Sequence, residues 1–245
     1  ACCFAPGLVL ANPVGPSVAH GQASFNSLGK TLTVTNSPGA IINWRGFSIA
    51  GGETTRFVQQ NAASAVLNRV VGKDASAIFG ALQSNGRVFL INPNGIVFGA
   101  GAQIDTAGLV ASTLNMLDSD FIMGRMRFGH TPGAGPLSNA GEIRTPIGGR
   151  VLLIAPQSVE NSGIIHSPKG EVILAAGKSV ELADSANPEV RVEITAPEAR
   201  AVNLGKIVAE SGRVGIYGGI VANRGIVSAD SAVVGDNGRI VFKAT

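Results

Sequence analysis

Carboxylate side chains are the first candidates for chemistry in this chain of 245 residues. The tightest acidic pair, Asp118 and Asp120, lies in an irregular, methionine-rich segment, and Asp184 and Glu189 lie near a proline-containing loop. Enzymes that cleave polysaccharides need such groups to converge on a Ca²⁺ ion or to act as general acid and base. Neither pair has a clear partner group in the sequence, so we predict that both are solvated loop carboxylates.

Histidine and cysteine are too few and too scattered to predict a catalytic or metal site. His20, His130 and His166 are isolated from one another and from acidic residues. Cys2 and Cys3 are neighbours, which places them poorly for an unstrained disulfide, and no cluster completes a set of metal ligands. The sequence contains no Gly-x-Ser-x-Gly, phosphate-loop or His-Glu-x-x-His motif. We therefore predict a protein that is not an enzyme and uses neither a cofactor nor a metal.

Charge and composition narrow the class of protein further. The 19 basic and 16 acidic residues are scattered, with a net charge of +3 and no basic run interleaved with aromatic residues, so we expect no nucleic-acid partner. No apolar run reaches the length of a transmembrane helix, so no integral membrane segment is expected. Glycine contributes 33 residues between short runs of valine, isoleucine and leucine, which is typical of short strands and tight turns. The chain is predicted to be all-β.

The beginning of the chain differs from the rest. Residues 1–11 are apolar and uncharged, and Val9-Leu10-Ala11 resembles the small-residue site that precedes a signal-peptidase cut. We interpret this stretch as the remnant of a secretory signal peptide; the alternative is an ordinary first strand. Residues 12–60 are turn-rich and are predicted to form a cap, and residues 61–245 are predicted to form stacked coils.

One short helical turn is expected within the predicted coils. In residues 61–83, Asp74 could cap a turn whose apolar face is formed by Ile78, Phe79 and Leu82. The turn is too short to organise a helical layer, so we expect it to connect two strands.

Residues 86–98 predict a strand, a sharp turn and a second strand. The apolar residues 88–91 lead into Asn92-Pro93-Asn94-Gly95, and a second apolar run begins at Ile96. Proline fixes its φ and lacks an N–H, while the Asn-Gly pair accepts positive φ at low cost. Because residues 88–91 are apolar without alternation, we expect this strand to be buried on both faces.

A repeated motif decides the predicted fold. The pattern Asn-x-Gly-x-(Ile/Val) occurs four times, beginning at Asn139, Asn161, Asn203 and Asn223. The intervals are 22, 42 and 20 residues, which we interpret as one period of about 21 residues with one unit skipped or degenerate. Glycine-led strands follow the motifs and begin at Gly149, Gly170, Gly212 and Gly238, in the same series as the earlier strand at Gly86. A period near 20 residues predicts a solenoid.

The kind of solenoid follows from the residue types. The units are rich in β-branched residues and glycine and nearly free of helix, which favours a parallel β-helix over a leucine-rich repeat. About ten coils, stacked at the strand spacing of ~4.8 Å, would make a rod roughly 45–50 Å long. The recurrent asparagines either stack as a ladder of amides or serve as ordinary turn residues. Because residues 238–242 read as an intact repeat strand, we expect a longer protein beyond Thr245.

Several motifs, in a fixed order, are similar to those of a known family. They are Ala-Ile-Ile-Asn-Trp-Arg-Gly-Phe-Ser-Ile at 40–49, Val-Leu-Asn-Arg-Val at 66–70, Ile-Phe-Gly at 78–80, Asn-Gly-Arg-Val-Phe-Leu-Ile-Asn-Pro-Asn-Gly at 85–95 and Gly-Leu-Val-Ala-Ser-Thr-Leu at 108–114. The set resembles the two-partner secretion (TPS) domains, or haemagglutination activity domains, with which exoproteins of the filamentous haemagglutinin type begin. The repeats extend the likeness to about residue 183.

The resemblance implies a fold and a function. The fold would be a right-handed parallel β-helix with an N-terminal cap and extra-helical strands. The function would be to target a large adhesin, haemolysin or toxin for secretion, through the POTRA domains of a cognate outer-membrane transporter of the Omp85 type (TpsB), and to nucleate folding of the β-helix during export. The exoprotein would pass through the periplasm of a Gram-negative bacterium and be secreted or stay on the cell surface.

The resemblance also implies roles for individual residues. In the family, the asparagines of the Asn-Pro-Asn-Gly motif matter for secretion, which transfers to Asn92 and Asn94. We expect both to fix a turn of the folding nucleus rather than to touch a partner. One branch has a second motif, Asn-Pro-Asn-Leu, where this chain has Asn68 and Arg69, as in the high-molecular-weight adhesin branch.

Two other functions remain open at this point. A carbohydrate-active β-helix enzyme would need acidic and basic side chains that converge on one groove. An adhesive solenoid would bind a host-cell glycan or protein by itself, without a transporter-targeting role. For the secretion domain we expect a monomer, and any contact with a host glycan or protein would be made through the full exoprotein.

Overall fold

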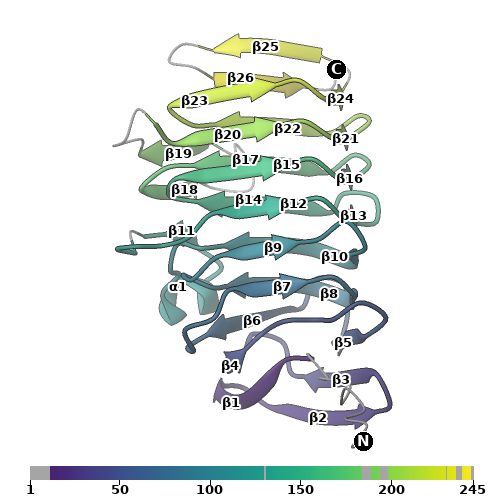
Figure 1. Cartoon of the computed structure of the whole chain (residues 1–245). Coiled ribbons are helices and arrows are strands. Elements are labelled where there is room, and N and C mark those ends of the chain that lie inside the picture. The colour runs from purple at the N-terminus through teal and green to yellow at the C-terminus, as the bar shows by residue number, and fades with distance from the viewer. Residues whose placement is uncertain are drawn as a thin grey trace, which may run out of the picture.

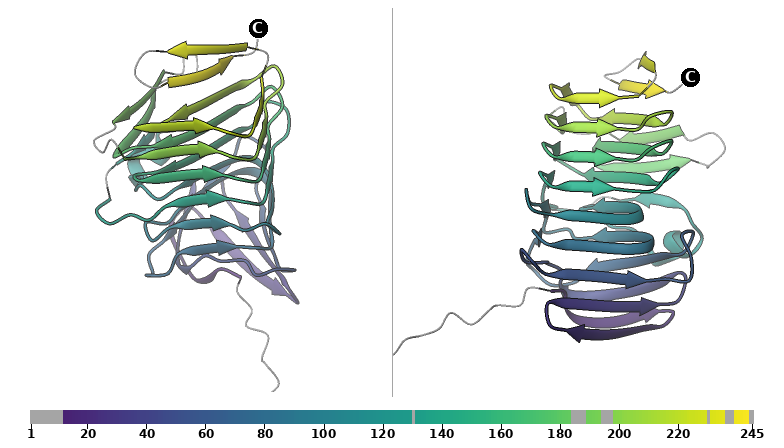
Figure 2. Two further views of the ribbon diagram at one scale, coloured as in Figure 1. Left: turned by 45° about the horizontal axis from the view of Figure 1, so that its top comes forward. Right: turned by 90° about the vertical axis from the view of Figure 1, so that its right-hand side faces the viewer.

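Strands from successive coils stack in register, so the molecule is a parallel β-helix with three faces (Figure 1; Figure 2). The computed structural model describes residues 12–129, 131–183, 189–193, 198–229, 231–235 and 239–243. The predicted signal-peptide remnant at residues 1–11 therefore lies outside the described residues, as do His130 and Asp184. The prediction of an all-β parallel β-helix is confirmed.

Two faces of the helix belong to one continuous 17-stranded sheet. The parallel strands of the first face are β4 (Ala40–Gly46), β6 (Ala65–Val70), the second halves of β8 (Ala81–Ile91) and β10 (Gln103–Ser112), β14 (Arg150–Ala155), β17 (Glu171–Ala176) and β22 (Arg213–Tyr217). Those of the second face are β3 (Thr31–Asn36), β5 (Thr54–Val58), the first halves of β8 and β10, β13 (Glu142–Arg144), β16 (Ile164–His166), β21 (Lys206–Val208) and β24 (Ile226–Ser228). Because β8 and β10 pass from one face to the other, they join the two faces.

The third face is a separate six-stranded parallel sheet. Its strands are β7 (Ser76–Ile78), β9 (Ile96–Phe98), β12 (Leu137–Asn139), β15 (Ser158–Asn161), β20 (Arg200–Asn203) and β23 (Ile220–Asn223). These strands face the viewer in Figure 1.

Antiparallel strands lie at both ends of the stack. At the N-terminal end, β1 (Val14–His20) pairs with β4 and β2 (Ala23–Leu28) pairs with β3. At the other end, β26 (Arg239–Lys243) runs antiparallel to β22, and β25 (Ser231–Gly235) runs antiparallel to β26. The prediction that residues 238–242 form an intact repeat strand is therefore wrong, since a repeat strand would run parallel to β22. The division between cap and coils at residue 60 stays a prediction.

Alternate residues of the first face pack into two different cores. Val88 and Leu90 belong to the central core between the three faces, whereas Phe89 and Ile91 belong to a second core on the outer side of the sheet. All four side chains are at most 3% exposed. The prediction of a strand buried on both faces is confirmed for this segment.

An outer module covers the second core. Helix α1 (Asp118–Ile122) and β11 (Met126–Phe128) lie between β10 and β12, and β18 (Ser179–Ala183) and β19 (Glu189–Glu193) lie between β17 and β20. The three strands form an antiparallel sheet in the order β11-β18-β19. Phe121 and Phe128 contribute the largest side chains of this module to the second core. These are the extra-helical strands that the resemblance implied.

The outer module also explains the irregular spacing of the repeats. Asn161 pairs directly with Asn203, so the interval of 42 residues holds no skipped or degenerate coil, and that interpretation is wrong. The additional residues leave the stack and form β18 and β19. The prediction of about ten coils was too high for the same reason, because an inserted hairpin adds residues without adding a strand to the six of the third face.

The helical turn expected within residues 61–83 is not formed. This segment contains β6, β7 and the beginning of β8. Ile78 and Leu82 are both fully buried, but on different faces, and Phe79 is 48% exposed. The α-helix of the described residues is α1 instead, and no helix among them is long and apolar enough to cross a membrane.

Candidate functional site

The Asn-Pro-Asn-Gly turn lies directly after β8, where the chain passes from the first face to the third. Asn92 is fully buried. Its side-chain oxygen accepts hydrogen bonds from the backbone N–H and the side-chain amide of Asn94, both at 3.0 Å. Its Nδ2 donates to the carbonyl oxygen of Asp74 at 3.0 Å and to Oγ of Ser76 at 2.9 Å. The side-chain amide of Asn92 therefore binds the turn through its oxygen and the preceding coil through its nitrogen.

Asn94 and Gly95 complete the turn on its outer side. Asn94 is exposed, and its Nδ2 donates to the carbonyl oxygen of Gly72 at 2.9 Å. Gly95 has a φ of 115°, a conformation that side chains disfavour. Its N–H donates to the carbonyl oxygen of Asn92 at 3.2 Å, which closes the turn. Of the two residues expected to accept positive φ, Gly95 alone does so.

The coil that follows also holds the turn. Gly135 donates its N–H to the carbonyl oxygen of Pro93 at 2.8 Å, and Ile96 donates to the carbonyl oxygen of Pro136 at 3.2 Å. A Cβ on Gly135 would lie 2.8 Å from the carbonyl oxygen of Asn94, so glycine is needed for this close approach. The turn is thus hydrogen-bonded to the chain before it and to the chain after it.

Asn68 links three successive strands of the first face. Its Oδ1 accepts a hydrogen bond from Nε1 of Trp44 in β4 at 2.9 Å, and its Nδ2 donates to the carbonyl oxygen of Phe89 in β8 at 3.2 Å. Trp44 and Asn68 are both fully buried. A buried indole N–H needs an acceptor, so Asn68 satisfies the tryptophan while bridging to the strand that leads into the Asn-Pro-Asn-Gly turn.

Arg69 holds the outer module. Its Nη2 donates to the carbonyl oxygen of Met116 and lies 2.7 Å from Oδ1 of Asp118. Asp120 is 6% exposed and lies 2.7 Å from Nε of Arg125. The prediction of solvated loop carboxylates is therefore wrong for Asp120, since α1 buries it beside an arginine. Asp118 is more exposed but is also paired.

The repeat asparagines form a ladder of amides at one corner of the helix. Nδ2 of Asn139 donates to Oδ1 of Asn161 at 2.7 Å, Asn161 donates to Asn203 at 2.7 Å, and Asn203 donates to Asn223 at 2.8 Å. Asn139 also accepts a hydrogen bond from the backbone N–H of Gly141 at 3.1 Å. The amides therefore connect coils and close their own turns, which combines the two roles that the sequence left open.

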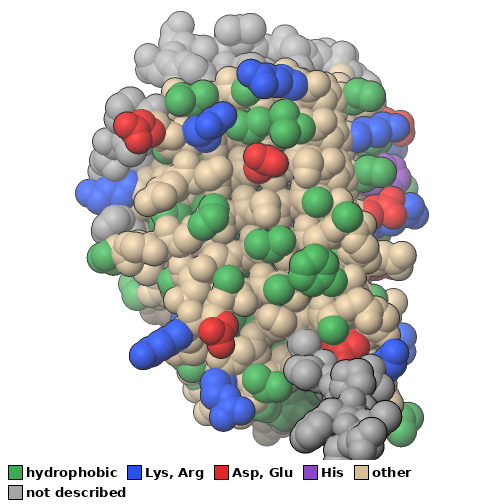
Figure 3. All heavy atoms as spheres, in the orientation of Figure 1, with side chains coloured by type: hydrophobic (Ala, Val, Ile, Leu, Met, Phe, Trp, Pro, Cys, Tyr) green, Lys and Arg blue, Asp and Glu red, His purple; other side chains and the backbone are tan. Residues whose placement is uncertain are grey.

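The remaining candidates for chemistry do not converge among the described residues. His20 lies in β1 and His166 lies at the end of β16 on the second face. No group of three histidine, cysteine, aspartate or glutamate side chains in the described part of the chain could hold a metal ion. Figure 3 shows charged side chains scattered over the third face. The side chain of Glu189 lies outside the described residues.

Sequence reasoning missed the partners of these asparagines. Ser76 and Gly135 stand in no motif, and their contacts with the turn arise from stacking. The link between Trp44 and Asn68 had a signal, because a core tryptophan needs an acceptor for its N–H, and a neighbouring strand of a solenoid with this period would supply it about one coil later.

Comparison with known proteins identifies the family. Residues 12–245 match the model of the TPS secretion domain. The chain belongs to the TPS secretion domain family. Among solved structures, this TPS domain is similar to the HMW1 secretion domain from Haemophilus influenzae, with 39% identity and a TM-score of 0.85 over 91% of this chain and 60% of that one. It shares the fold of a filamentous hemagglutinin secretion domain, with 17% identity and a TM-score of 0.53 over 89% of this chain and 95% of that one.

Curated relatives match a smaller part of the TPS domain. Two heme/hemopexin-binding proteins of Haemophilus influenzae are 40% identical over 105 residues and 43% identical over 77 residues. The matched regions are 42% and 31% of this chain but 12% and 8% of those proteins. The matched regions thus cover only about a tenth of the length of these relatives.

Membership of the family confirms the resemblance seen in the sequence, including its likeness to the high-molecular-weight adhesins. TPS domains are non-enzymatic secretion domains of large exported proteins, and TpsB transporters recognise them in two-partner secretion. The dependence of secretion on the Asn-Pro-Asn-Gly turn stays a prediction.

Proposed function

We propose that this TPS domain targets an exoprotein of the adhesin, haemolysin or toxin type for export, and that its Asn-Pro-Asn-Gly turn nucleates the β-helix. The supporting observation is the hydrogen bonding of the turn. Asn92 binds the preceding coil through Asp74 and Ser76, and Pro93 binds the following one through Gly135. Formation of this turn therefore aligns successive coils and creates a sheet edge on which the next coil can add.

Stacking of successive coils then favours outward movement of the chain over backward movement. An unfolded chain that emerges through the transporter folds onto the coils already formed, and each added coil buries apolar side chains and completes hydrogen bonds. The asparagine ladder of Asn139, Asn161, Asn203 and Asn223 adds one amide hydrogen bond at each step. Backward movement would break these contacts, so folding biases the chain outward.

The partner in the periplasm is proposed to be the POTRA domains of an Omp85-type TpsB transporter. The domain acts as a monomer. The full exoprotein is released or stays on the surface of a Gram-negative cell, and contacts with a host glycan or protein are made by the full exoprotein.

An export assay tests this function. The domain, preceded by a complete signal peptide, is expressed with and without its cognate transporter, and the culture medium is assayed for it. We expect transporter-dependent release that falls strongly in Asn92→Ala and less in Asn94→Ala, because Asn92 is fully buried and Asn94 is exposed.

Asn26→Ala is the matched control, because Asn26 is an exposed asparagine of β2. Its release should equal that of the wild type, and periplasmic levels of all variants should be similar. Release without any transporter would favour an adhesive solenoid instead, and cleavage of a polyuronate would favour a carbohydrate-active enzyme. Indifference to both Asn92→Ala and Asn94→Ala would remove the turn from the mechanism.

A further inference from the structure

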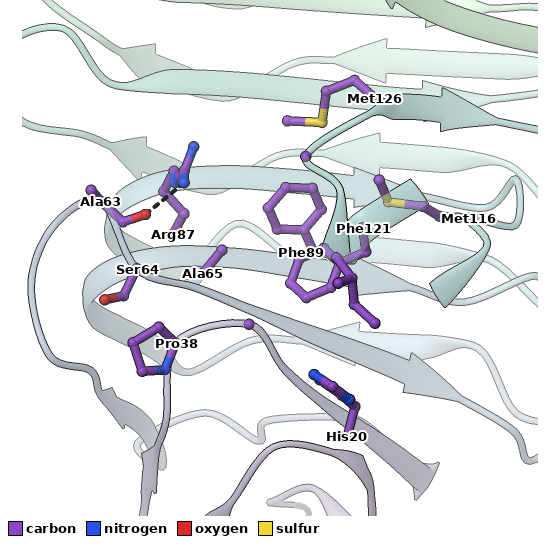
Figure 4. Close-up of a pocket in the computed structure, with 13 residues that line it drawn as sticks. His20, Pro38, Ala63, Ser64, Ala65, Arg87, Phe89, Met116, Phe121 and Met126 are labelled. Carbon is purple, nitrogen blue, oxygen red and sulfur yellow. Dashed lines mark hydrogen bonds between the residues drawn. The ribbon is translucent and has the colours of Figure 1, made fainter. Parts of the chain in front are cut away.

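A hollow of about 400 Å³ opens beside helix α1 on the outer side of the first face (Figure 4). Three separate parts of the chain form it. The segment from β1 to β4 contributes His20 and Gly39, β8 contributes Arg87 and Phe89, and the outer module contributes Phe121 and Met126. The hollow therefore exists only when these three parts of the chain have assembled.

The floor and one wall of the hollow are apolar. The rings of Phe89 and Phe121 meet edge to face with centroids 5.1 Å apart. Met126 is partly buried against the same core, and Ile122 of α1 lines the hollow while 51% exposed. An exposed isoleucine beside two aromatic rings gives a second apolar side chain a place to pack.

The opposite wall carries a positive charge that has no acidic partner in the described part of the chain. Arg87, Gly108, Arg150, Glu171 and Arg213 stand at equivalent positions of successive strands on the first face. Glu171 pairs with both Arg150, at 2.7 Å, and Arg213. One carboxylate thus serves the two arginines of the later coils, and none of the described carboxylates pairs with Arg87.

Arg87 is held in place and kept close to another cation. It donates to the carbonyl oxygen of Ala63, which orients its guanidinium at the rim of the hollow, as Figure 4 shows. Partial burial lowers the pKa of Arg87, and the positive charge of Arg150 lowers it further. Gly108 stands between the two arginines without a side chain to separate them. A carboxylate that approached Arg87 would relieve this repulsion and gain a planar, two-pronged donor.

We propose that this hollow docks a periplasmic segment of the transporter in which an aspartate or glutamate lies next to a large apolar side chain. The carboxylate would bind Arg87, and the apolar side chain would pack on Phe89, Phe121 and Ile122. The proposal rests on the proposed secretion function and names the surface that the transporter reads. Because three chain segments build the hollow, the transporter would recognise the assembled N-terminal nucleus in the periplasm, before the chain is threaded outward in an unfolded state.

A small probe tests the chemistry of the hollow without the transporter. The chain contains 3 methionines, so methyl-labelled methionine gives one signal each for Met116, Met123 and Met126. Met116 and Met126 line the hollow, whereas Met123 does not and is 63% exposed. On titration with N-acetyl-phenylalanine, whose carboxylate adjoins an aromatic ring, we expect shifts at Met116 and Met126 but not at Met123. The neutral amide of the probe should bind roughly fivefold more weakly, and Arg87→Gln should abolish that difference.

Binding to the transporter tests the identity of the occupant. The purified POTRA fragment of the cognate transporter is titrated into the folded domain at low and at physiological salt. Arg87→Gln and Ile122→Ser should each weaken binding by roughly tenfold, and the loss in Arg87→Gln should be larger at low salt. Arg144→Gln and Ile226→Ser are the matched controls, since both residues are exposed, lie on other strands and do not line the hollow. They should change binding less than twofold, and all four variants should melt within a few degrees of the wild type.

The outcomes separate the two proposals. If the wild type is exported in a transporter-dependent manner but Arg87→Gln and Ile122→Ser bind the fragment as it does, the docking proposal is wrong and the secretion function stands. Binding of the probe at Met116 and Met126 without any effect of the variants on the fragment would lead to the same conclusion. If export does not depend on the transporter, the secretion function itself fails. Shifts at Met123 as large as those at Met126 would show that the hollow does not select the probe.

Discussion

The difference between Asn92 and Asn94 gives the sharpest test of the turn. Both asparagines belong to one motif, but their environments are opposite, because Asn92 is fully buried and Asn94 is exposed. Asn92→Ala removes the donor that serves Ser76, which is itself fully buried, and the acceptor that serves the backbone N–H of Asn94. Each lost hydrogen bond costs about 1 kcal/mol, and a buried group left without a partner costs up to ~3 kcal/mol.

These magnitudes predict a destabilisation of about 3 kcal/mol for Asn92→Ala. Asn94→Ala should cost about 1 kcal/mol, since water can replace its amide at an exposed site. The free energy of unfolding is measured by urea titration, with the fluorescence of Trp44 as the probe, because the chain has a single tryptophan and it is fully buried. The dependence on urea should keep its slope, which reports the surface exposed on unfolding.

A double-mutant cycle separates the hydrogen bond from the general effect of truncation. Asn92→Ala and Ser76→Ala should together cost less than the sum of the single variants, with a coupling of about 1 kcal/mol. Asn26→Ala should change stability by less than about 0.5 kcal/mol, as expected of an exposed residue. Equal losses in Asn92→Ala and Asn94→Ala, or a coupling near zero, would refute the reasoning that burial makes Asn92 the central residue of the turn.

Two further predictions concern the other buried amides. Asn161→Leu removes the hydrogen bonds to both Asn139 and Asn203 and should lower the free energy of unfolding by about 3 kcal/mol. Asn223→Leu removes one such hydrogen bond and should lower it by about 1 kcal/mol, with both values measured by urea titration. Equal losses in the two variants would argue against an energetically coupled ladder. Trp44→Phe leaves Oδ1 of Asn68 without its indole donor and should lower stability by about 2 kcal/mol, seen as a drop in Tm by circular dichroism, and adding Asn68→Leu should recover part of it. An unchanged Tm in Trp44→Phe would mean that water or another group satisfies Asn68.

Local sequence predicted the strands well and the connections badly. Residues 88–91 were expected to be buried on both faces because they are apolar without alternation, and they contact two cores. The helical turn predicted at Ile78, Phe79 and Leu82 failed, because two buried residues four positions apart fit a helix and also fit two strands on either side of a bend. Periodicity over so few residues does not separate these cases.

The interpretation of the 42-residue interval was wrong for a related reason. An interval of 42 residues fits two coils, and it also fits one coil with a hairpin inserted. Which of the two occurs depends on whether the extra strands find a surface to cover. Here β18 pairs with β11, which belongs to an earlier insertion in the chain, and the two strands cover the second core on the outer side of the first face. No property of residues 162–202 alone contains that information.

The sequence by itself determined the class of fold, the glycine-closed turn and the family, because these depend on residue types at short, regular spacing. Only the tertiary structure decided what the turn holds together. Asn92 binds Ser76 of the preceding coil, Gly135 binds Pro93 across an insertion, and Arg87 and Phe121 line one hollow built from three segments. Such contacts depend on the register in which the coils stack. This register is set by the burial of side chains from all coils at once, so a local motif cannot specify it.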